Sequence, residues 1–411
     1  MNILILHTAR FDAIAYDRGI DHDAHHVVYV APPQKLDELP AGLPCTKLAR
    51  PGTGNLYDEV EAVVVASGLV FDFLISVSEY ELLDAARLRQ RFGIPGPQPQ
   101  QAEKIRNKAV MKRHVAAAGI AVPRFAMLDA WLGAGLPIGA QAAVIIKPID
   151  GASSLNVVRF DNQAVLRAAL AARSTGIAQL DEGDARHYAR FEVEEYVPGS
   201  VIHIDGVTRQ GELLLKLASR KVNSCLDFAN GKPMGSVQMD DWAGMDAWVG
   251  RVLAAVEIRD GAFHLEVIDG PDGIVFLEIA HRVGGGRITE TFERKTGIHL
   301  SVADLRSITD PDYLLVPVWD RDHYFGWFAV PGHHLGTRYC SVSGYEYLEQ
   351  DDRLLALNKL GPGQPVSPRV TYVETMLPLA GMLKGDSPAG LHRTMTELFE
   401  KVRCRPCHEA S

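Results

Sequence analysis

The sequence predicts an α/β protein with several subdomains, and three observations lead to this fold class. Short apolar strands alternate with helix-like stretches through the first hundred residues, which is typical of a small parallel sheet covered by helices. Residues 93–99 are dense in Pro and Gly and indicate a boundary. A new alternation of strands begins near residue 311. Because 411 residues exceed what one compact core usually holds, we expect two to four subdomains.

The composition is that of a globular protein, with 47% hydrophobic and 23% charged residues. The formal net charge of −9 and the lack of a long basic run argue against nucleic acid as a main partner. The sequence starts without a signal peptide pattern, and no apolar stretch reaches membrane-spanning length. Five scattered cysteines suit reduced thiols better than disulfides. These features predict a cytoplasmic protein that binds neither nucleic acid nor membrane.

The N-terminal region is expected to present a ligand-binding edge. Strands are predicted at residues 3–6, 27–30 and 71–77, and a helix follows over 80–92. Parallel sheets bind ligands at the carboxyl ends of their strands. Glu79 falls at such an end, where it either contacts a substrate or caps the following helix.

The rest of the chain mixes helices and strands. No internal repeat or low-complexity segment interrupts this pattern. The predicted helices are 102–118, 162–173, 246–255 and 388–402, and the predicted strands are 143–148, 157–160, 191–199, 202–207 and 213–217.

Two glutamates lie in apolar, strand-like runs in the middle of the chain. Glu266 and Glu278 flank the stretch 269–273, Asp-Gly-Pro-Asp-Gly, which predicts a tight hairpin turn. Pairing of the two strands would bring the carboxylates side by side, and this is costly unless a cation satisfies them. Oxygen ligands favour Mg²⁺ or Mn²⁺, and Mg²⁺ often binds through carboxylates plus substrate phosphates. The alternative is a pair of edge glutamates on a solvated face.

A candidate phosphate site precedes this hairpin in the sequence. Lys147 ends a predicted strand and is followed by a loop that contains Gly151, Ser153 and Ser154. Small residues let backbone N–H groups approach phosphate oxygens, and the lysine adds a point charge. The spacing is not that of a Walker A motif. Lys108 supplies a second lysine from the preceding helix.

Two further stretches carry groups suited to a nucleotide or an anion. The strand containing Glu194, Glu195 and Val197 offers a backbone that could read the edge of a purine, or it is a half-exposed strand with acidic residues outward. Arg282 offers a planar fork for a carboxylate or phosphoryl group, and the glycines at 284–286 free backbone N–H groups to face an oxyanion. The triple glycine could equally be a flexible turn.

These motifs occur in an order that resembles the ATP-grasp superfamily of carboxylate-amine ligases. The series runs from Lys108 through the segment 119–123, Lys147 with its loop and the strand at 193–199 to the two glutamates and Arg282. Within that superfamily the chain is most similar to the L-amino-acid ligases, which make dipeptides and related natural products. The resemblance implies three domains: a Rossmann-like domain at 1–100, a two-lobed ATP-grasp domain at 101–310 with a mobile lid at about 124–193, and a β-rich α+β domain at 311–411.

The resemblance also implies a role for each candidate residue. Glu266 and Glu278 would carry Mg²⁺, with Mn²⁺ as the other option. Arg282 and the backbone of Gly285 would be catalytic, and Arg282 and Glu79 would bind substrate. The residues expected to bind ATP are Lys108, Lys147, Ser153, Ser154, Glu194, Glu195, Val197 and His203.

Two departures from the family pattern affect these expectations. Ala280 stands where relatives often have an asparagine that binds metal, so we expect weaker or altered metal coordination. The glutamate that commonly binds ribose would fall near residues 200–202, none of which is acidic, so His203 or Asp205 would have to substitute for it.

The expected activity is ATP-dependent formation of an amide or peptide bond through an acylphosphate, with a small carboxylate and an amine as partners. One alternative is an ATP-grasp enzyme of the purine-pathway or carboxylase type, for which Arg220 and Lys221 are the candidate phosphate cluster. The other is an ATP-binding protein without ligase activity, which Ala280 favours. The sequence names neither substrate, and a homodimer is one option for its assembly.

Overall fold

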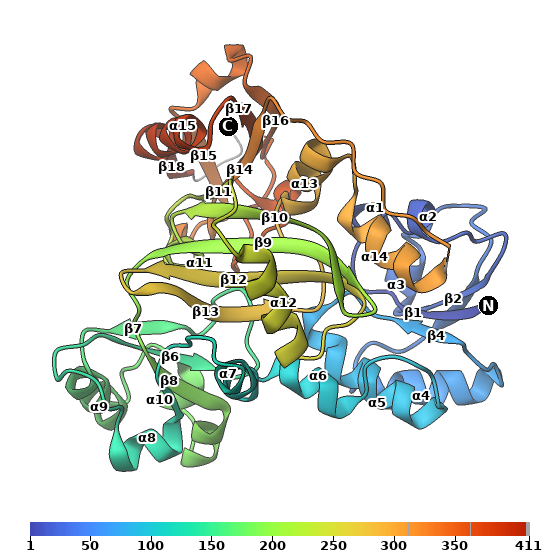
Figure 1. The fold of residues 1–411 in the computed structure, drawn as a ribbon, viewed down its shortest axis with the longest axis horizontal. Helices are drawn as coiled ribbons and strands as arrows, with labels where there is room; N and C mark the ends of the chain where they lie inside the picture. The colour runs from blue at the N-terminus through green and yellow to red at the C-terminus, as the bar shows by residue number, and fades with distance from the viewer. Residues whose placement is uncertain (311, 362, 408–411) are drawn as a thin grey trace.

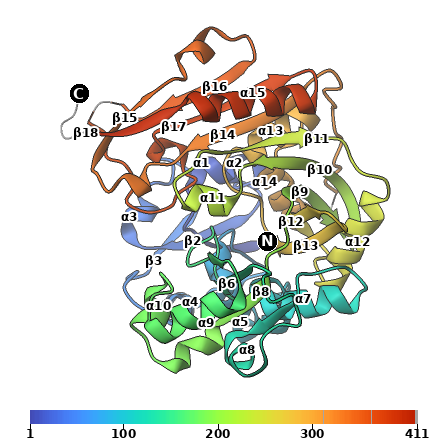
Figure 2. The same cartoon turned by 90° about the vertical axis from the view of Figure 1, so that its left-hand side faces the viewer.

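The computed structural model describes residues 1–310, 312–361 and 363–407. Figure 1 shows a parallel sheet near the N-terminus, a small green lobe and a large central sheet that continues into the last hundred residues. Figure 2 places the small lobe below the central sheet and the C-terminal helix and strands above it. The predicted α/β class is confirmed.

The N-terminal sheet has the order β3-β2-β1-β4, and its strands pair in parallel, as predicted. Its strands are β1 (Asn2–Leu6), β2 (His26–Ala31), β3 (Thr46–Ala49) and β4 (Phe73–Ile75). Its helices are α1 (Phe11–Ile14), α2 (Tyr16–Gly19), α3 (Pro33–Leu36), α4 (Leu56–Ser67), the 3₁₀ turn η1 (Glu79–Glu81) and α5 (Leu82–Phe92). The prediction missed β3 because its residues alternate between exposed and half-buried positions instead of forming an apolar run.

The helix predicted over 102–118 is two helices, α6 (Pro99–Arg106) and α7 (Lys108–Ala117). Asn107 separates them because its backbone is extended and its side chain accepts hydrogen bonds from the backbone N–H groups of Ala109 and Val110. Asparagine at an N-cap is a strong start signal for a new helix. Lys108 is therefore the first residue of α7.

The small lobe is a four-stranded antiparallel sheet of order β5-β8-β6-β7 packed against short helices. Its strands are β5 (Phe125–Met127), β6 (Val144–Pro148), β7 (Val158–Phe160) and β8 (Phe191–Glu195). Its helical segments are α8 (Leu128–Ala134), α9 (Gln163–Ala172), α10 (Ala178–Asp181) and η2 (Ala185–Arg190). Trp131, Leu166 and Phe191 lie at the centre of its own apolar core.

The central sheet has eight strands in the order β13-β12-β9-β10-β11-β14-β17-β16. These strands are β9 (Ser200–Arg209), β10 (Glu212–Val222), β11 (Met234–Met239), β12 (Gly261–Gly270), β13 (Gly273–Ala280), β14 (Tyr324–Val330), β16 (Leu354–Lys359) and β17 (Leu379–Gly385). The helices around it are α11 (Cys225–Ala229), α12 (Met245–Ala255), α13 (Ile288–Thr296), α14 (Leu300–Thr309) and α15 (Pro388–Lys401). The last hundred residues also contain the 3₁₀ turns η3 (His333–Leu335), η4 (Glu346–Gln350) and η5 (Glu374–Met376). A separate two-stranded sheet is formed by β15 (Tyr339–Ser343) and β18 (Arg403–Cys407).

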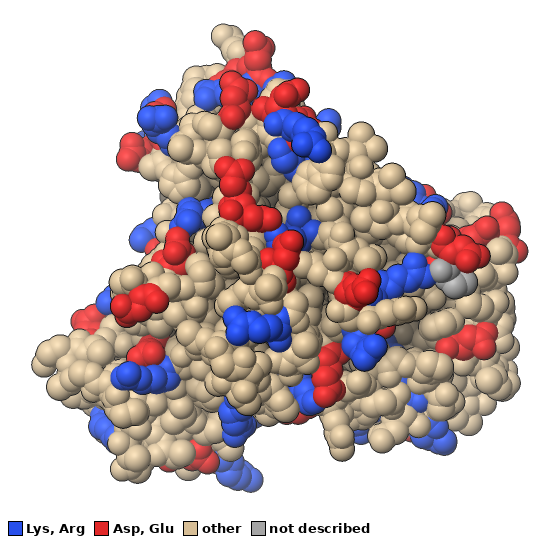
Figure 3. All heavy atoms as spheres, in the orientation of Figure 1, with Lys and Arg blue, Asp and Glu red and all other residues tan. Residues whose placement is uncertain are grey.

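Strand β11 pairs with β14, so the central sheet continues past residue 310. The division of the chain into domains, with a mobile lid, stays a prediction. Among the described residues, no helix is long and apolar enough to cross a membrane. On the face shown in Figure 3, basic and acidic side chains are interspersed.

Candidate active site between the small lobe and the central sheet

A cavity of about 350 Å³ lies between the small lobe and the central sheet. Its wall draws on the turn η1, the helix α7, the small lobe and the β12–β13 hairpin. It contains every predicted site residue except His203, namely Glu79, Lys108, Lys147, Ser153, Ser154, Glu194, Glu195, Val197, Glu266, Glu278, Arg282 and Gly285.

The two glutamates face each other across the β12–β13 hairpin, where Glu266 and Glu278 are direct partners in the register. Glu266 is buried at 7% exposure and forms an ion pair with Lys221. Glu278 forms an ion pair of 3.1 Å with the Nζ of Lys108. The solvated-face alternative therefore fails for Glu266, and each carboxylate is neutralised by a lysine of the protein.

Both carboxylates are held in the ionised form. Burial opposes the charge on Glu266, but Lys221 and His264 outweigh it and keep the pKa of Glu266 well below its usual range. Burial likewise opposes the charge on Glu278, and Lys108 together with Lys147 overcomes both burial and the repulsion from Glu266, so that the pKa of Glu278 is lowered. Two adjacent carboxylates that need positive charge fit a divalent cation with oxygen ligands. Ala280 adds no ligand oxygen from its side chain.

Lys147 is held in place by a buried ion-pair network. The Nζ of Lys147 lies 2.7 Å from Glu194, and Lys112 lies 2.7 Å from both Glu192 and Glu194. Burial lowers the pKa of Lys147, but Glu194, Glu192 and Glu278 outweigh this effect and raise it. Lys147 is therefore a fixed cation at the cavity wall.

The acidic strand differs in part from its prediction. The carboxylate of Glu194 points at Lys112 and Lys147, and that of Glu195 accepts a hydrogen bond of 2.9 Å from the backbone N–H of Arg124. Both carboxylates already have protein partners. Hydrogen bonds to the edge of a purine would therefore have to come from the backbone near Val197. The half-exposed alternative fails for Glu194, which is only 3% exposed.

The loop after Lys147 has an uncommon backbone. Ser153 and Ser154 have φ values of 57° and 54°, and Asn156 has 58°, which places three non-glycine residues in the left-handed region. Such residues persist only where the surroundings fix them. Successive backbone N–H groups in a turn can form an anion-binding concavity, which is the feature that a phosphate site in this loop would need. The Nζ of Lys108 donates a hydrogen bond of 2.7 Å to the carbonyl of Gly151 and so joins the loop to α7.

Glu79 positions the candidate catalytic arginine. Its carboxylate accepts a hydrogen bond of 2.9 Å from the Nε of Arg282 and one of 3.2 Å from Arg106. The Nη1 of Arg282 donates to the carbonyl of Val283 at 2.8 Å. Both arginines bond to the carboxylate of Glu79, so this carboxylate does not cap the following helix. A substrate would have to compete with the arginines for it.

The triple glycine is not a loose turn. A Cβ on Gly284 would lie 2.8 Å from both Asp205 Oδ1 and His264 Nδ1, and one on Gly286, at φ +68°, would lie 2.7 Å from the Trp327 ring. A Cβ on Gly285 would meet nothing within 4 Å. The outer glycines are therefore packed tightly, while the middle one faces open space at the cavity wall.

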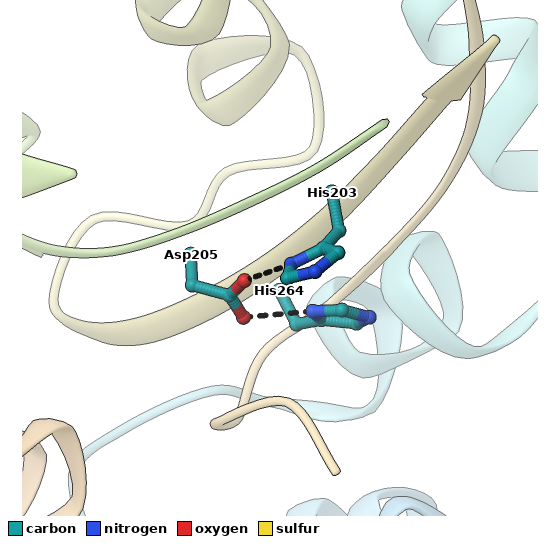
Figure 4. A group of neighbouring side chains, drawn as sticks. All are labelled: His203, Asp205 and His264. Atoms are coloured by element: carbon teal, nitrogen blue, oxygen red, sulfur yellow. Dashed lines mark hydrogen bonds and ion pairs between the residues drawn. The ribbon is translucent and has the colours of Figure 1, made fainter. Parts of the chain in front are cut away.

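The predicted nucleotide role of His203 is corrected by its position outside the cavity wall. It is 2% exposed, its Nδ1 donates to Asp205 at 2.5 Å and its Nε2 pairs with Ser236 at 2.5 Å. Asp205 is also engaged, because its other oxygen accepts from the Nδ1 of His264 at 2.7 Å. Figure 4 shows one imidazole against each oxygen of Asp205. Neither His203 nor Asp205 is free to bind ribose.

The model of the ATP-grasp domain family matches residues 140–290. The chain carries an ATP-grasp domain. This match includes Lys147, its loop, the acidic strand, both glutamates and the arginine with its glycines. ATP-grasp enzymes use ATP and divalent metals in general, which agrees with the lysines and paired carboxylates of the cavity.

Proteins similar to this chain include bacterial ligases. The L-arginine-specific L-amino acid ligase of Bacillus subtilis is 28% identical over 276 residues, which are 64% of this chain and 63% of that protein. The structure of an L-amino acid ligase from Bacillus licheniformis matches with a TM-score of 0.68 at 16% identity, covering 99% of each chain. That of N5-carboxyaminoimidazole ribonucleotide synthetase from Thermotoga maritima matches with a TM-score of 0.65 at 15% identity, also covering 99% of each chain. The two structures share the fold of this chain.

Sequence reasoning gave Lys112 and Glu192 no role and assigned Lys221 and Asp205 to other roles, whereas the structure places all four in contacts that support the candidate site. Lys112 follows Lys108 by one helical turn, and this spacing signals a shared face. Glu192 alternates with Glu194 on one face of β8. Lys221 and Asp205 had no local signal that tied them to Glu266, because their contacts join strands distant in the sequence.

Proposed function

We propose that this ATP-grasp protein is an ATP-dependent carboxylate-amine ligase that forms an amide or peptide bond through an acylphosphate. One observation carries the proposal: a single cavity holds two lysines and a phosphate loop on one wall, and two ionised glutamates with an arginine and an open glycine on the other. These residues can position the reactants and neutralise their charge, but they include no obvious protein nucleophile. Phosphoryl transfer depends mainly on positioning and charge neutralisation, so a nucleophile from the protein is not needed.

ATP would bind with its phosphates toward α7 and the small lobe. Lys108 and Lys147 would contact phosphate oxygens, and the backbone around Ser153 and Ser154 would add N–H donors. The adenine would lie against the backbone near Val197. Lys108 now pairs with Glu278 and the Gly151 carbonyl, so ATP binding would require it to change partners.

Glu266 and Glu278 would hold Mg²⁺, or Mn²⁺, through their oxygens. The bound ion would neutralise charge on the phosphates and on these two carboxylates. Lys108 would have to leave Glu278 to free that carboxylate for the ion, whereas Lys221 bonds to Oε1 of Glu266 and could stay there while Oε2 binds the ion. Because Ala280 supplies no third ligand, the two glutamates would hold the ion together with phosphate and water oxygens.

The proposed chemistry has two steps. A substrate carboxylate oxygen attacks the γ-phosphorus of ATP, a new O–P bond forms, and ADP leaves with the electrons of the broken P–O bond. An amine nitrogen then attacks the acyl carbon, phosphate leaves and the amine loses its proton. Arg282 and the backbone N–H of Gly285 would stabilise the oxyanion of the tetrahedral intermediate. Closure of the small lobe would exclude water, which would otherwise hydrolyse the acylphosphate.

We propose amino acids, or an amino acid and a small carboxylic acid, as the substrates. Support comes from the two relatives whose names include L-amino acid ligase. The purine-pathway or carboxylase alternative rests on a structural likeness at 15% identity. Its expected phosphate cluster is weak, because Arg220 pairs with Asp269 and Lys221 pairs with Glu266. A cytoplasmic location stays a prediction.

A phosphate-release assay tests the proposal. The protein is incubated with ATP, Mg²⁺ and pooled amino acids, and the products are analysed by mass spectrometry. We expect phosphate release that requires an acid and an amine together, with one new amide per phosphate. ATP binding without any such release would favour the ATP-binding protein that is not a ligase. Release that requires bicarbonate or a ribosyl phosphate amine would favour the purine-pathway type.

A further inference from the structure

A buried hydrogen-bond network lies behind the candidate metal ligand Glu266. His264 stands between two carboxylates: its Nδ1 lies 2.7 Å from Asp205 Oδ1 and its Nε2 lies 3.2 Å from Glu266 Oε1. Because a carboxylate only accepts hydrogen bonds, His264 must donate from both ring nitrogens. His203 holds the second oxygen of Asp205, so both oxygens of Asp205 have an imidazole partner (Figure 4).

The donors on Glu266 are directed to one of its two oxygens. The Nζ of Lys221 and the Nε2 of His264 both bond to Oε1. Two donors on the same oxygen fix the rotation of the carboxylate group. They leave Oε2 as the oxygen that can be presented to a cation.

The contact between Asp205 and His264 is closed off by the glycine loop. A Cβ on Gly284 would come within 2.8 Å of both Asp205 Oδ1 and His264 Nδ1. Asp205 is 1% exposed, so its hydrogen bonds form away from bulk water, where they are stronger than in solvent. The orientation of His264 is therefore set by Asp205 and not by solvent.

The same cluster has the composition of a metal site, because ligand atoms of His203, Asp205 and His264 lie within 4.8 Å of one another. Each ring nitrogen of the two histidines nevertheless has a hydrogen-bond partner in Asp205, Ser236 or Glu266. These partners account for the geometry without a cation.

We propose that Asp205 is a positioning residue that acts through His264: it orients the imidazole so that Glu266 presents one fixed oxygen to the metal. This inference rests on the proposed function, because it requires a cation at Glu266. Partners behind a metal ligand typically contribute about 10-fold to 100-fold in metal affinity. Asp205 and His264 should contribute a factor in this range without binding the ion.

Binding of Mn²⁺ followed by electron paramagnetic resonance tests the inference. The full-length protein is titrated with Mn²⁺ in the presence of an ATP analogue that cannot transfer its γ-phosphate. The variants are Asp205→Asn, His264→Asn and His264→Gln, with Glu266→Gln as the reference for loss of a ligand. Ser219→Ala is the matched control, because Ser219 is a buried hydroxyl on β10 directly opposite His203. Thermal melts by circular dichroism check that each variant folds.

We expect Asp205→Asn and His264→Asn to weaken Mn²⁺ binding about 10-fold to 100-fold. His264→Gln should bind more tightly than His264→Asn, because the longer glutamine can place an N–H near the Nε2 position and still donate to Glu266. Ser219→Ala should bind like the wild type. If Asp205→Asn does not fold, the comparison of Mn²⁺ affinity between His264→Asn and His264→Gln still tests the inference.

Three results would count against the inference in different ways. Wild-type affinity in folded Asp205→Asn and His264→Asn, with weakened binding in Glu266→Gln, would reject the positioning role and leave the proposed function intact. Unchanged binding in Glu266→Gln would reject the metal site and the proposed function with it. A second Mn²⁺ site that survives Glu266→Gln but disappears in His264→Asn would show that the cluster itself binds metal.

Discussion

At the scale of single residues, three glutamates of the cavity are each balanced by at least one lysine from the protein. Glu194 has Lys112 and Lys147, Glu266 has Lys221, and Glu278 has Lys108. A buried charge without a partner is costly, so this pairing offsets the cost of placing the three carboxylates in the cavity wall. Under the proposed function, ATP and its metal would therefore have to exchange partners with some of these groups and not simply add to them.

Glu278→Gln should reduce ADP formation at least about 100-fold, because an amide of the same shape lacks the charge that a divalent cation requires. Phosphate release with pooled amino acids measures this effect. Glu257→Gln is the control, since Glu257 forms a surface pair with Lys104 and such pairs contribute little. Turnover retained in Glu278→Gln would contradict the metal assignment.

Glu81 should make stability depend on pH. Burial raises its pKa to about 7, against weaker opposing hydrogen bonds from Ser76 and Thr8. Between pH 4.5 and 7 the folded protein therefore keeps a proton that the unfolded chain has released, so this group's contribution to stability falls as pH rises. Glu81→Gln should be about 2–3 kcal/mol more stable than the wild type at pH 8 and close to it at pH 4.5. Urea unfolding at both pH values measures the difference, and an equal difference at both would contradict the assignment.

At the scale of elements, the β12–β13 hairpin and the glycine loop after it form one wall of the site. The hairpin places Glu266 opposite Glu278, and the loop leaves Gly285 open between two packed glycines. These features arise from short stretches of sequence. They are therefore the parts of the site that local patterns describe well.

Alanine substitutions separate packing from chemistry in the glycine loop. Gly286→Ala should destabilise the protein by about 1–3 kcal/mol, because it combines a clash with Trp327 and a positive φ. Gly285→Ala should leave the melting temperature nearly unchanged but lower phosphate release, because its new methyl group enters the cavity. Melting curves and turnover of the two variants check this contrast. Equal loss of stability in both would show that the loop is packed differently.

The hairpin, the loop after Lys147 and the arginine were predicted from sequence because each is a local pattern of charged, apolar and glycine residues. The helix start after Asn107 also has a local signal, because asparagine favours N-caps. The apolar pattern on both sides nevertheless led to the prediction of one long helix. The contacts of Lys112 with Glu192 and of Lys221 with Glu266 were not predictable, because tertiary packing brings these pairs together. His203 looked available for a nucleotide until its partners Asp205 and Ser236 were located.

At the scale of the whole molecule, the last hundred residues complete the central sheet. Strand β14 pairs with β11 on one side and β17 on the other. Its Trp327 also packs on Gly286 in the cavity loop. The C-terminal part therefore stabilises the site as well as the sheet.

A chain that ends at residue 310 should not unfold cooperatively. It lacks β14, so the edge of β11 is unpaired and the apolar residues packed against it are exposed. A chain that ends at residue 402 is the control, since it loses β18, which pairs only with β15 among the described strands. Circular dichroism melts compare the two. A cooperative melt of the shorter chain would show that residues 1–310 fold independently.

Transfer of oxygen from the substrate acid to phosphate tests the proposed ligase chemistry most directly. The protein is given ATP, Mg²⁺ and pooled amino acids labelled with ¹⁸O in their carboxylates, and the released phosphate is analysed by mass spectrometry. An acylphosphate passes one carboxylate oxygen to phosphate when the amine displaces it, so each phosphate formed with a new amide should carry one ¹⁸O. Unlabelled phosphate released with an amide product would contradict the acylphosphate, and intact ATP binding without any release would contradict ligase activity itself.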